Sequence, residues 1–92
     1  MKIVIVDDEI ILSTKIAKKL ENQGFSVIVY NSYKKFFQRA PGVVDLYVLD
    51  LSLRDGSGID IIKHLRATDI QSPIMIISGY GDTDNITHGL DI

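Results

Sequence analysis

The sequence predicts an α/β fold built on a parallel sheet, and the pattern of apolar residues is the reason. Short apolar runs rich in β-branched residues alternate with amphipathic segments, in the order βαβαβαβα. Unbroken apolar runs of this length are typical of strands buried on both faces. Strands that alternate with helices favour a parallel sheet with helices on both faces and right-handed crossovers.

The first predicted strand covers residues 2–6 and ends at Asp7-Asp8, where an amphipathic helix follows. Apolar residues recur every four positions in this segment, while lysines fall between them, which indicates a helix. We expect Asp8 to be its N-cap and Gly24 to end it. The apolar positions are Leu12, Ile16 and Leu20, with Ala17 beside them.

The remaining predicted elements continue the alternation, and turn residues separate them. They are a strand over residues 25–30, a short helix capped by Asn31 or Ser32 and ended by Pro41-Gly42, a strand over residues 46–49 that ends in Asp50, a loop over residues 54–58, a helix from Ile59, a strand over residues 74–77, and a weak helix from Asp82 to Thr87.

Composition limits the class of protein. The chain has 92 residues, enough for one small domain, and no cysteine, which excludes disulfides and thiolate metal sites. Its net charge of −2 does not indicate a polyanionic partner, and we expect no direct nucleic-acid binding. No apolar run reaches the length of a membrane span, and the N-terminus lacks the features of a signal peptide. We therefore expect a cytoplasmic protein without membrane contact.

Acidic and hydroxyl side chains lie at the ends of three predicted strands. Asp7 and Asp8 follow the first strand, Asp50 ends the third, and Ser78 ends the fourth. In an open α/β sheet the carboxyl ends of the strands share one edge, where ligands bind. Three carboxylates repel one another unless a hard cation such as Mg²⁺ lies between them. Asp50 would then be a carboxylate nucleophile for a phosphoryl group.

Each of these residues also has a purely structural interpretation. Asp8 alone could be a helix cap, Asp50 a turn residue, and Ser78 a turn or cap hydroxyl. Their joint placement at the ends of three strands favours the functional interpretation. His64 and His88 have no partners at ligand spacing and are expected at the surface.

Three motifs resemble the receiver domain of two-component response regulators. They are Ile-Val-Asp-Asp-Glu after the first strand, Leu-Asp-Leu-Ser-Leu-Arg-Asp-Gly-Ser-Gly after the third, and Pro-Ile-Met-Ile-Ile-Ser-Gly-Tyr-Gly-Asp at the fourth. They match in order and spacing, and the resemblance covers residues 1–92. It implies a flavodoxin-like, doubly wound sheet of strand order 2-1-3-4-5.

The resemblance implies a role for each matching residue. Asp50 would accept a phosphoryl group from a sensor histidine kinase or phosphotransfer protein, so the domain would signal rather than act as an ordinary enzyme. Asp7, Asp8, Asp50 and the backbone carbonyl of Ser52 would hold Mg²⁺. Ser78 would be the switch hydroxyl, and Gly79 the small residue beside the phosphoryl group.

The sequence departs from the family pattern in a few places. Arg54 stands where the family often has proline, and Tyr80 lies at a position that varies. The chain ends at Ile92, so the resemblance implies that the fifth strand, the lysine after it and the fifth helix are absent. The order would then be 2-1-3-4, with residues 74–77 at an open edge. We expect dimerisation or element exchange through that edge, and impaired phosphorylation-coupled switching.

Two other functions remain alternatives. The chain could be a protein-binding module or dimerising fragment that works without phosphorylation. A small Mg²⁺-dependent phosphohydrolase is disfavoured, because such enzymes often carry a second acid two residues after the nucleophile, where this chain has Ser52. Neither a P-loop nor a dinucleotide-binding fingerprint is present in the sequence.

Overall fold

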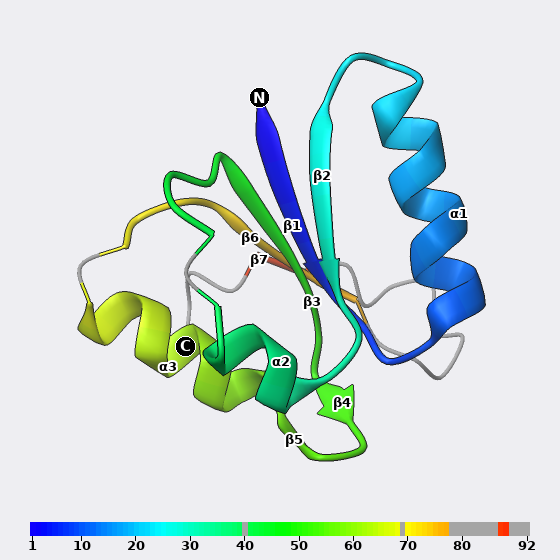
Figure 1. Cartoon of the computed structure of the whole chain (residues 1–92). Coiled ribbons are helices and arrows are strands. Elements are labelled where there is room, and N and C mark those ends of the chain that lie inside the picture. The colour runs from blue at the N-terminus through cyan, green and yellow to red at the C-terminus, as the bar shows by residue number, and fades with distance from the viewer. Residues whose placement is uncertain (40, 69, 78–86, 89–92) are drawn as a thin grey trace.

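A mainly parallel sheet forms the centre of the computed structural model (Figure 1). The structure describes residues 1–39, 41–68 and 70–77, and the backbone of residues 87–88. The strand order is β2-β1-β3-β6-β7, and the first four strands are mutually parallel. These four are β1 (Lys2–Val6), β2 (Ser26–Tyr30), β3 (Leu46–Asp50) and β6 (Ile74–Ile77). The predicted α/β class and the predicted order 2-1-3-4 are confirmed.

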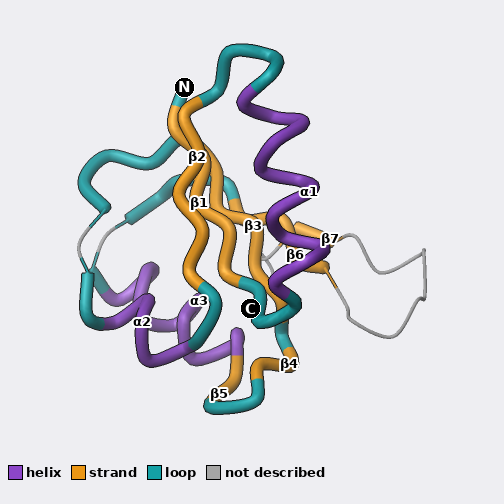
Figure 2. Tube along the Cα trace, turned by 45° about the vertical axis from the view of Figure 1, so that its right-hand side comes forward, coloured by secondary structure: helices purple, strands orange, loops and turns teal. Residues whose placement is uncertain are grey.

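Helices cover both faces of this sheet (Figures 1 and 2). Helix α1 (Ile10–Glu21) lies on one face, and α2 (Tyr33–Phe37) and α3 (Gly58–Ala67) lie on the other. Successive side chains of a strand point to opposite faces, so β1 contributes to the apolar core on each face of the sheet. Its valines pack with residues of α2 and α3, and its isoleucines pack with α1. The doubly wound arrangement therefore follows from strands that are apolar on both faces.

The helix ends show which capping predictions were right. Ser32 caps α2, because its hydroxyl oxygen accepts a hydrogen bond from the Lys35 backbone N–H at 3.0 Å. Gly24 follows α1 with φ of +96°, a conformation that favours glycine. The prediction that Asp8 caps α1 was wrong. The N-cap is Glu9, and its side chain makes no capping hydrogen bond, so the Asp8 carboxylate is free for another partner.

A short antiparallel hairpin follows β3, where the sequence predicted only a loop. It consists of β4 (Ser52–Leu53) and β5 (Gly56–Ser57) and leads directly into α3 (Figure 2). The turn residue Asp55 accepts hydrogen bonds from the backbone N–H groups of Tyr33 and Lys34, at 2.8 and 3.0 Å. These contacts join the hairpin to the first turn of α2.

The predicted open edge at β6 was wrong for the middle of that strand. A fifth strand, β7 (Thr87–His88), pairs antiparallel with it, in the register Met75 with His88 and Ile76 with Thr87. Backbone groups at an apolar edge need partners, and the chain itself supplies them here. The expected dimer or element exchange thus loses the open edge on which it rested. Thr87 is also not helical, and residues 82–86 of the predicted last helix lie outside the described residues.

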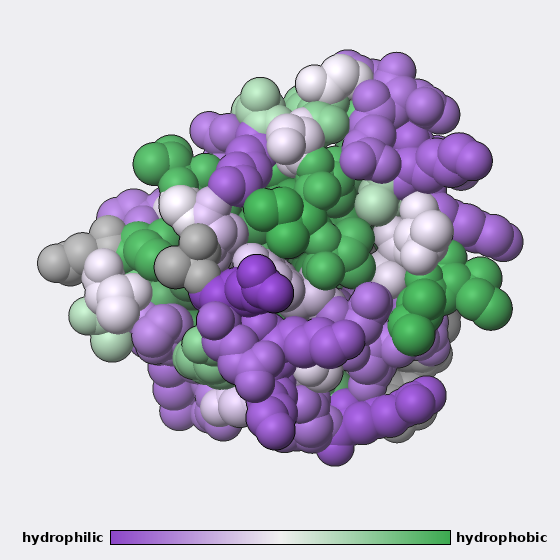
Figure 3. All heavy atoms as spheres, in the orientation of Figure 1, coloured by the Kyte–Doolittle hydropathy of each residue, from purple (hydrophilic) through white to green (hydrophobic). Residues whose placement is uncertain are grey.

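The surface mixes polar and apolar areas. The face in Figure 3 is mostly hydrophilic, with separate hydrophobic areas between the polar ones. The start of α1 exposes Ile10 and Ile11, which are 62% and 75% accessible. Within the described part of the chain, no helix combines the length and apolarity needed to cross a membrane.

Candidate functional site

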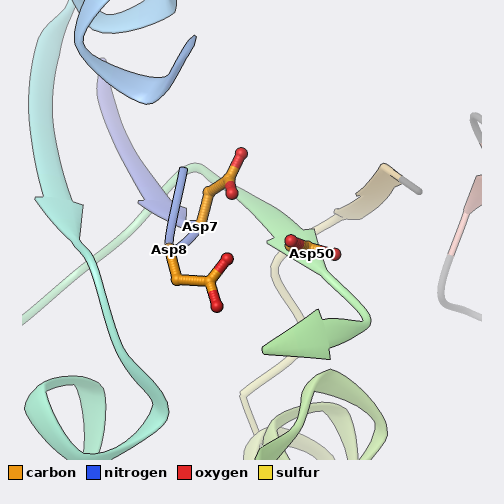
Figure 4. A group of neighbouring side chains, drawn as sticks. All are labelled: Asp7, Asp8 and Asp50. Atoms are coloured by element: carbon orange, nitrogen blue, oxygen red, sulfur yellow. The ribbon is translucent and has the colours of Figure 1, made fainter. Parts of the chain in front are cut away.

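The carboxylates of Asp7, Asp8 and Asp50 meet at the carboxyl ends of two neighbouring strands (Figure 4). Strands β1 and β3 are paired in parallel with Val6 opposite Leu49, so the acids that follow come out side by side. Each residue offers an oxygen atom within 4.8 Å of the others. Helix α1 returns on one face and α3 on the other, so this is the switch point of the sheet, where ligands bind in such folds. The predicted convergence of these acids is confirmed.

Backbone groups fix the two buried acids. Asp7 and Asp50 are only 2% and 4% exposed. One oxygen of Asp7 accepts the Glu9 N–H at 2.9 Å, and one oxygen of Asp50 accepts the Ser52 N–H, also at 2.9 Å. Each carboxylate thus orders the turn that leaves its own strand. These bonds use one oxygen of each side chain.

A second layer of polar contacts supports the end of β1. The Asn31 side-chain amide donates to the backbone carbonyl of Asp7 at 2.9 Å and to the Ser13 hydroxyl at 3.2 Å. Ser13 lies fully buried in α1, and its hydroxyl donates to the Ile10 carbonyl. The loop after β2 is therefore joined to the strand end that carries the acids and to the helix that follows it.

Burial and negative neighbours raise the pKa of Asp7 from its ordinary value of 3.8 to about 6. Loss of hydration is the main cause, and the charges of Asp50 and Glu9 add to it, whereas the hydrogen bond from the Glu9 N–H acts in the opposite direction. Part of the shift thus comes from repulsion between Asp7 and its negative neighbours. A bound cation would relieve this repulsion.

Asp8 faces solvent more than its neighbours, and Arg54 is its partner. The Arg54 backbone N–H donates to Asp8 Oδ2 at 2.8 Å, and the Arg54 Nε lies 3.8 Å from the same oxygen. The Arg54 side chain is 88% accessible and that of Asp8 is 13% accessible. Within the described residues, Arg54 is the only basic side chain paired with the cluster.

The donor set fits a hard divalent cation. Mg²⁺ prefers oxygen ligands, uses one or two carboxylates and retains water. Three carboxylates within 4.8 Å, two of them buried, provide such oxygens. Asp50 keeps one carboxylate oxygen outside its bond to Ser52, so it can also serve as a nucleophile.

The other predicted site residues have different outcomes. Ser52 begins β4 and is next to the cluster through its N–H bond to Asp50, while the role of its carbonyl remains a prediction. Ser78, Gly79 and Tyr80 lie outside the described residues. His64 is exposed, as predicted, and is not a member of the acidic cluster; its ring contacts Phe37 of α2.

Two residues next to the site had no assigned role in the sequence. Gly58 begins α3, and a Cβ atom there would overlap the Asp50 carbonyl oxygen and lie 2.9 Å from the Leu51 Cα. Only glycine allows α3 to start this close to the end of β3. In the sequence Gly58 stands at the end of the predicted loop over residues 54–58, and the short spacing from Asp50 to Gly58 is the signal for a close approach. For the second residue, Arg54, the only sign in the sequence is that it stands where the family often has proline.

Comparison with known families agrees with this geometry. The model of the response regulator receiver domain matches residues 3–92. The chain belongs to the response regulator receiver domain family.

A curated relative and a solved receiver domain support the same assignment, and a more distant structure shares the fold. The transcriptional regulatory protein CiaR of Streptococcus pneumoniae is 28% identical over 92 residues, which are 100% of this chain and 41% of CiaR. The receiver domain of the Francisella response regulator 1452 has a TM-score of 0.77 and 28% identity, over 91% of this chain and 70% of that one. Response regulator TrrA of Thermotoga maritima, solved in complex with Mg²⁺-BeF, has a TM-score of 0.76 and 21% identity, over 87% and 70% of the two chains. The chain thus spans about two fifths of the length of the curated relative CiaR.

Proposed function

We propose that this receiver domain accepts a phosphoryl group on Asp50 from a sensor histidine kinase or a phosphotransfer protein. The observation that carries the proposal is the meeting of three carboxylates at the carboxyl ends of β1 and β3. Family membership supports a signalling role rather than that of an ordinary enzyme. We assign residues 1–92 to one receiver domain.

The residues divide the chemistry between them. An oxygen of the Asp50 carboxylate forms a bond to phosphorus as the phosphorus–nitrogen bond of a phosphohistidine breaks. The imidazole nitrogen leaves with the bonding electrons and takes up a proton. The Ser52 N–H holds the other Asp50 oxygen, which orients the nucleophile.

We propose that Asp7, Asp8, Asp50 and the Ser52 carbonyl hold Mg²⁺. When bound, Mg²⁺ would neutralise the charge of the incoming phosphoryl group. The TrrA structure, which holds Mg²⁺-BeF in the same fold, is in keeping with this. The Ser78 hydroxyl and the space beside Gly79 are assigned to the phosphoryl group by their match to the family motif.

Labelling with a small phosphodonor tests the proposal. The chain is incubated with acetyl phosphate and MgCl₂, and its intact mass is measured. We expect the mass to rise by one phosphoryl group, and we expect Asp50→Asn or excess EDTA to abolish the rise. Asp60→Asn, at an exposed acid in the first turn of α3, is the matched control and should be labelled normally.

The possible results separate the proposed function from its main alternative. Labelling that persists in Asp50→Asn would contradict the assignment of the acceptor. A folded chain that binds Mg²⁺ and is never labelled would favour a protein-binding module that works without phosphorylation. Spectra of the labelled chain would also test whether phosphorylation switches its structure.

A further inference from the structure

We infer that Arg54 sets the Mg²⁺ affinity of the acidic cluster through two opposing contacts with Asp8, an inference that rests on the proposed metal site. The two residues are 46 positions apart in the sequence, and the hairpin that follows β3 brings them together. The backbone of Arg54 orients the Asp8 carboxylate, which favours cation binding. Its guanidinium is a resident counter-charge, which opposes cation binding.

The backbone contact is the shorter one. The Arg54 N–H lies 2.8 Å from Asp8 Oδ2, a normal distance for a charge-assisted hydrogen bond. It holds Asp8 Oδ2, in a carboxylate that offers an oxygen within 4.8 Å of oxygens of Asp7 and Asp50. A carboxylate fixed in this way loses less conformational entropy when it binds a cation. A proline at this position would lack the N–H.

The side-chain contact acts in the opposite direction. The Arg54 Nε lies 3.8 Å from the oxygen that the N–H already holds, so a positive charge is next to the cluster before any cation arrives. A divalent cation would be repelled by this charge or would displace it. Displacement is possible because the side chain is 88% accessible and borders an open groove along the first turn of α1. Screening by water keeps the effect modest.

Three substitutions separate the two contacts. Arg54→Ala removes the charge and keeps the N–H, so Mg²⁺ should bind about two- to fivefold more tightly, the range expected for an exposed ion pair. Arg54→Lys keeps a charge and should bind close to the wild-type level. Arg54→Pro removes charge and N–H together and should bind more weakly than Arg54→Ala. Arg39→Ala removes an exposed arginine outside the site and should change nothing.

The affinities are measured by NMR titration of the chain with MgCl₂ at low ionic strength, which follows the backbone amides of Asp8, Asp50 and Arg54. In the wild type, the Arg54 Nε–Hε resonance should move with the same titration curve, while those of Arg39 and Arg66 stay still. High salt should reduce the difference between wild type and Arg54→Ala, because it screens the exposed charge.

The outcomes distinguish this inference from the proposed function. If wild type and Arg54→Ala bind Mg²⁺ with the same affinity, the inferred role of the guanidinium is wrong and the metal site stands. If Arg54→Pro binds as tightly as Arg54→Ala, the inferred role of the backbone N–H is wrong. If no variant shows Mg²⁺-dependent shifts near the acids, the proposed metal site itself fails.

Discussion

Replacing Asp7 by asparagine should stabilise the chain when no divalent cation is present. Asp7 is 2% exposed and lies beside Asp50, and burial with this neighbour raises its pKa from 3.8 to about 6. Asparagine has nearly the same shape and can still accept the Glu9 N–H bond through its amide oxygen. The substitution therefore removes the charge and leaves the local hydrogen bond in place.

The size of the effect follows from the pKa. At 1.36 kcal/mol for each pKa unit, the rise to about 6 means that ionised Asp7 lowers the free energy of unfolding by about 3 kcal/mol. Between about pH 4 and pH 6 the folded chain binds more protons at Asp7 than the unfolded chain, so stability falls as pH rises through this window. Asp7→Asn should be more stable than wild type by about 1–3 kcal/mol above this window, because asparagine keeps part of the cost of burial.

Urea unfolding in EDTA, at about pH 8 and about pH 5, measures this difference. The advantage of Asp7→Asn should be full at the higher pH and about half as large at the lower one, because pH 5 lies midway through the window in which the folded and unfolded chains differ in protonation. Glu21→Gln, at an exposed carboxylate at the end of α1, is the control and should stay within about 0.5 kcal/mol of wild type. Added MgCl₂ should stabilise wild type more than Asp7→Asn. An Asp7→Asn chain that is less stable than wild type at the higher pH would refute the reasoning.

Two further substitutions test how the loop after β3 is held. Gly58→Ala should destabilise the chain by about 1–3 kcal/mol, because the new methyl group overlaps the Asp50 carbonyl, and a thermal melt would show it. Unchanged stability would mean that α3 can shift freely. Asp55→Ala should speed hydrogen exchange at the Tyr33 and Lys34 amides, which lose their acceptor. Those two hydrogen bonds lower the pKa of Asp55, and the bond from Lys34 is the larger cause. The contribution of Asp55 to stability is therefore present above its unfolded pKa and is lost as the pH falls through its folded pKa. Unchanged exchange in Asp55→Ala would contradict this role.

Local sequence pattern was enough to predict the elements on which the site is built. The apolar runs of β1 and β3 are buried on both faces, and β6 is buried on one face and partly buried on the other. Such runs have few alternatives to a parallel strand of the sheet. The cap at Ser32 and the stop at Gly24 depend on one residue and its immediate neighbours, so they could also be predicted. The meeting of the acids followed from these strands together with one topological rule.

Predictions that depended on distant partners were less successful. Asp8 has the right chemistry for a helix cap, but it bonds to Arg54, 46 residues away, and only the folded hairpin brings them together. The edge of β6 is paired with β7, a strand of two residues, too short to leave a pattern in the sequence.

The sequence by itself determined the α/β order, the central strands and the positions of the acids, because burial and chain direction fix these locally. The tertiary structure decided the electrostatic and packing environment of those acids. The raised pKa of Asp7, the contact of Arg54 with Asp8 and the tight approach of Gly58 to Asp50 all arise between segments that meet only in the fold. Charge repulsion and close packing depend on distances in space, which residue order alone does not give.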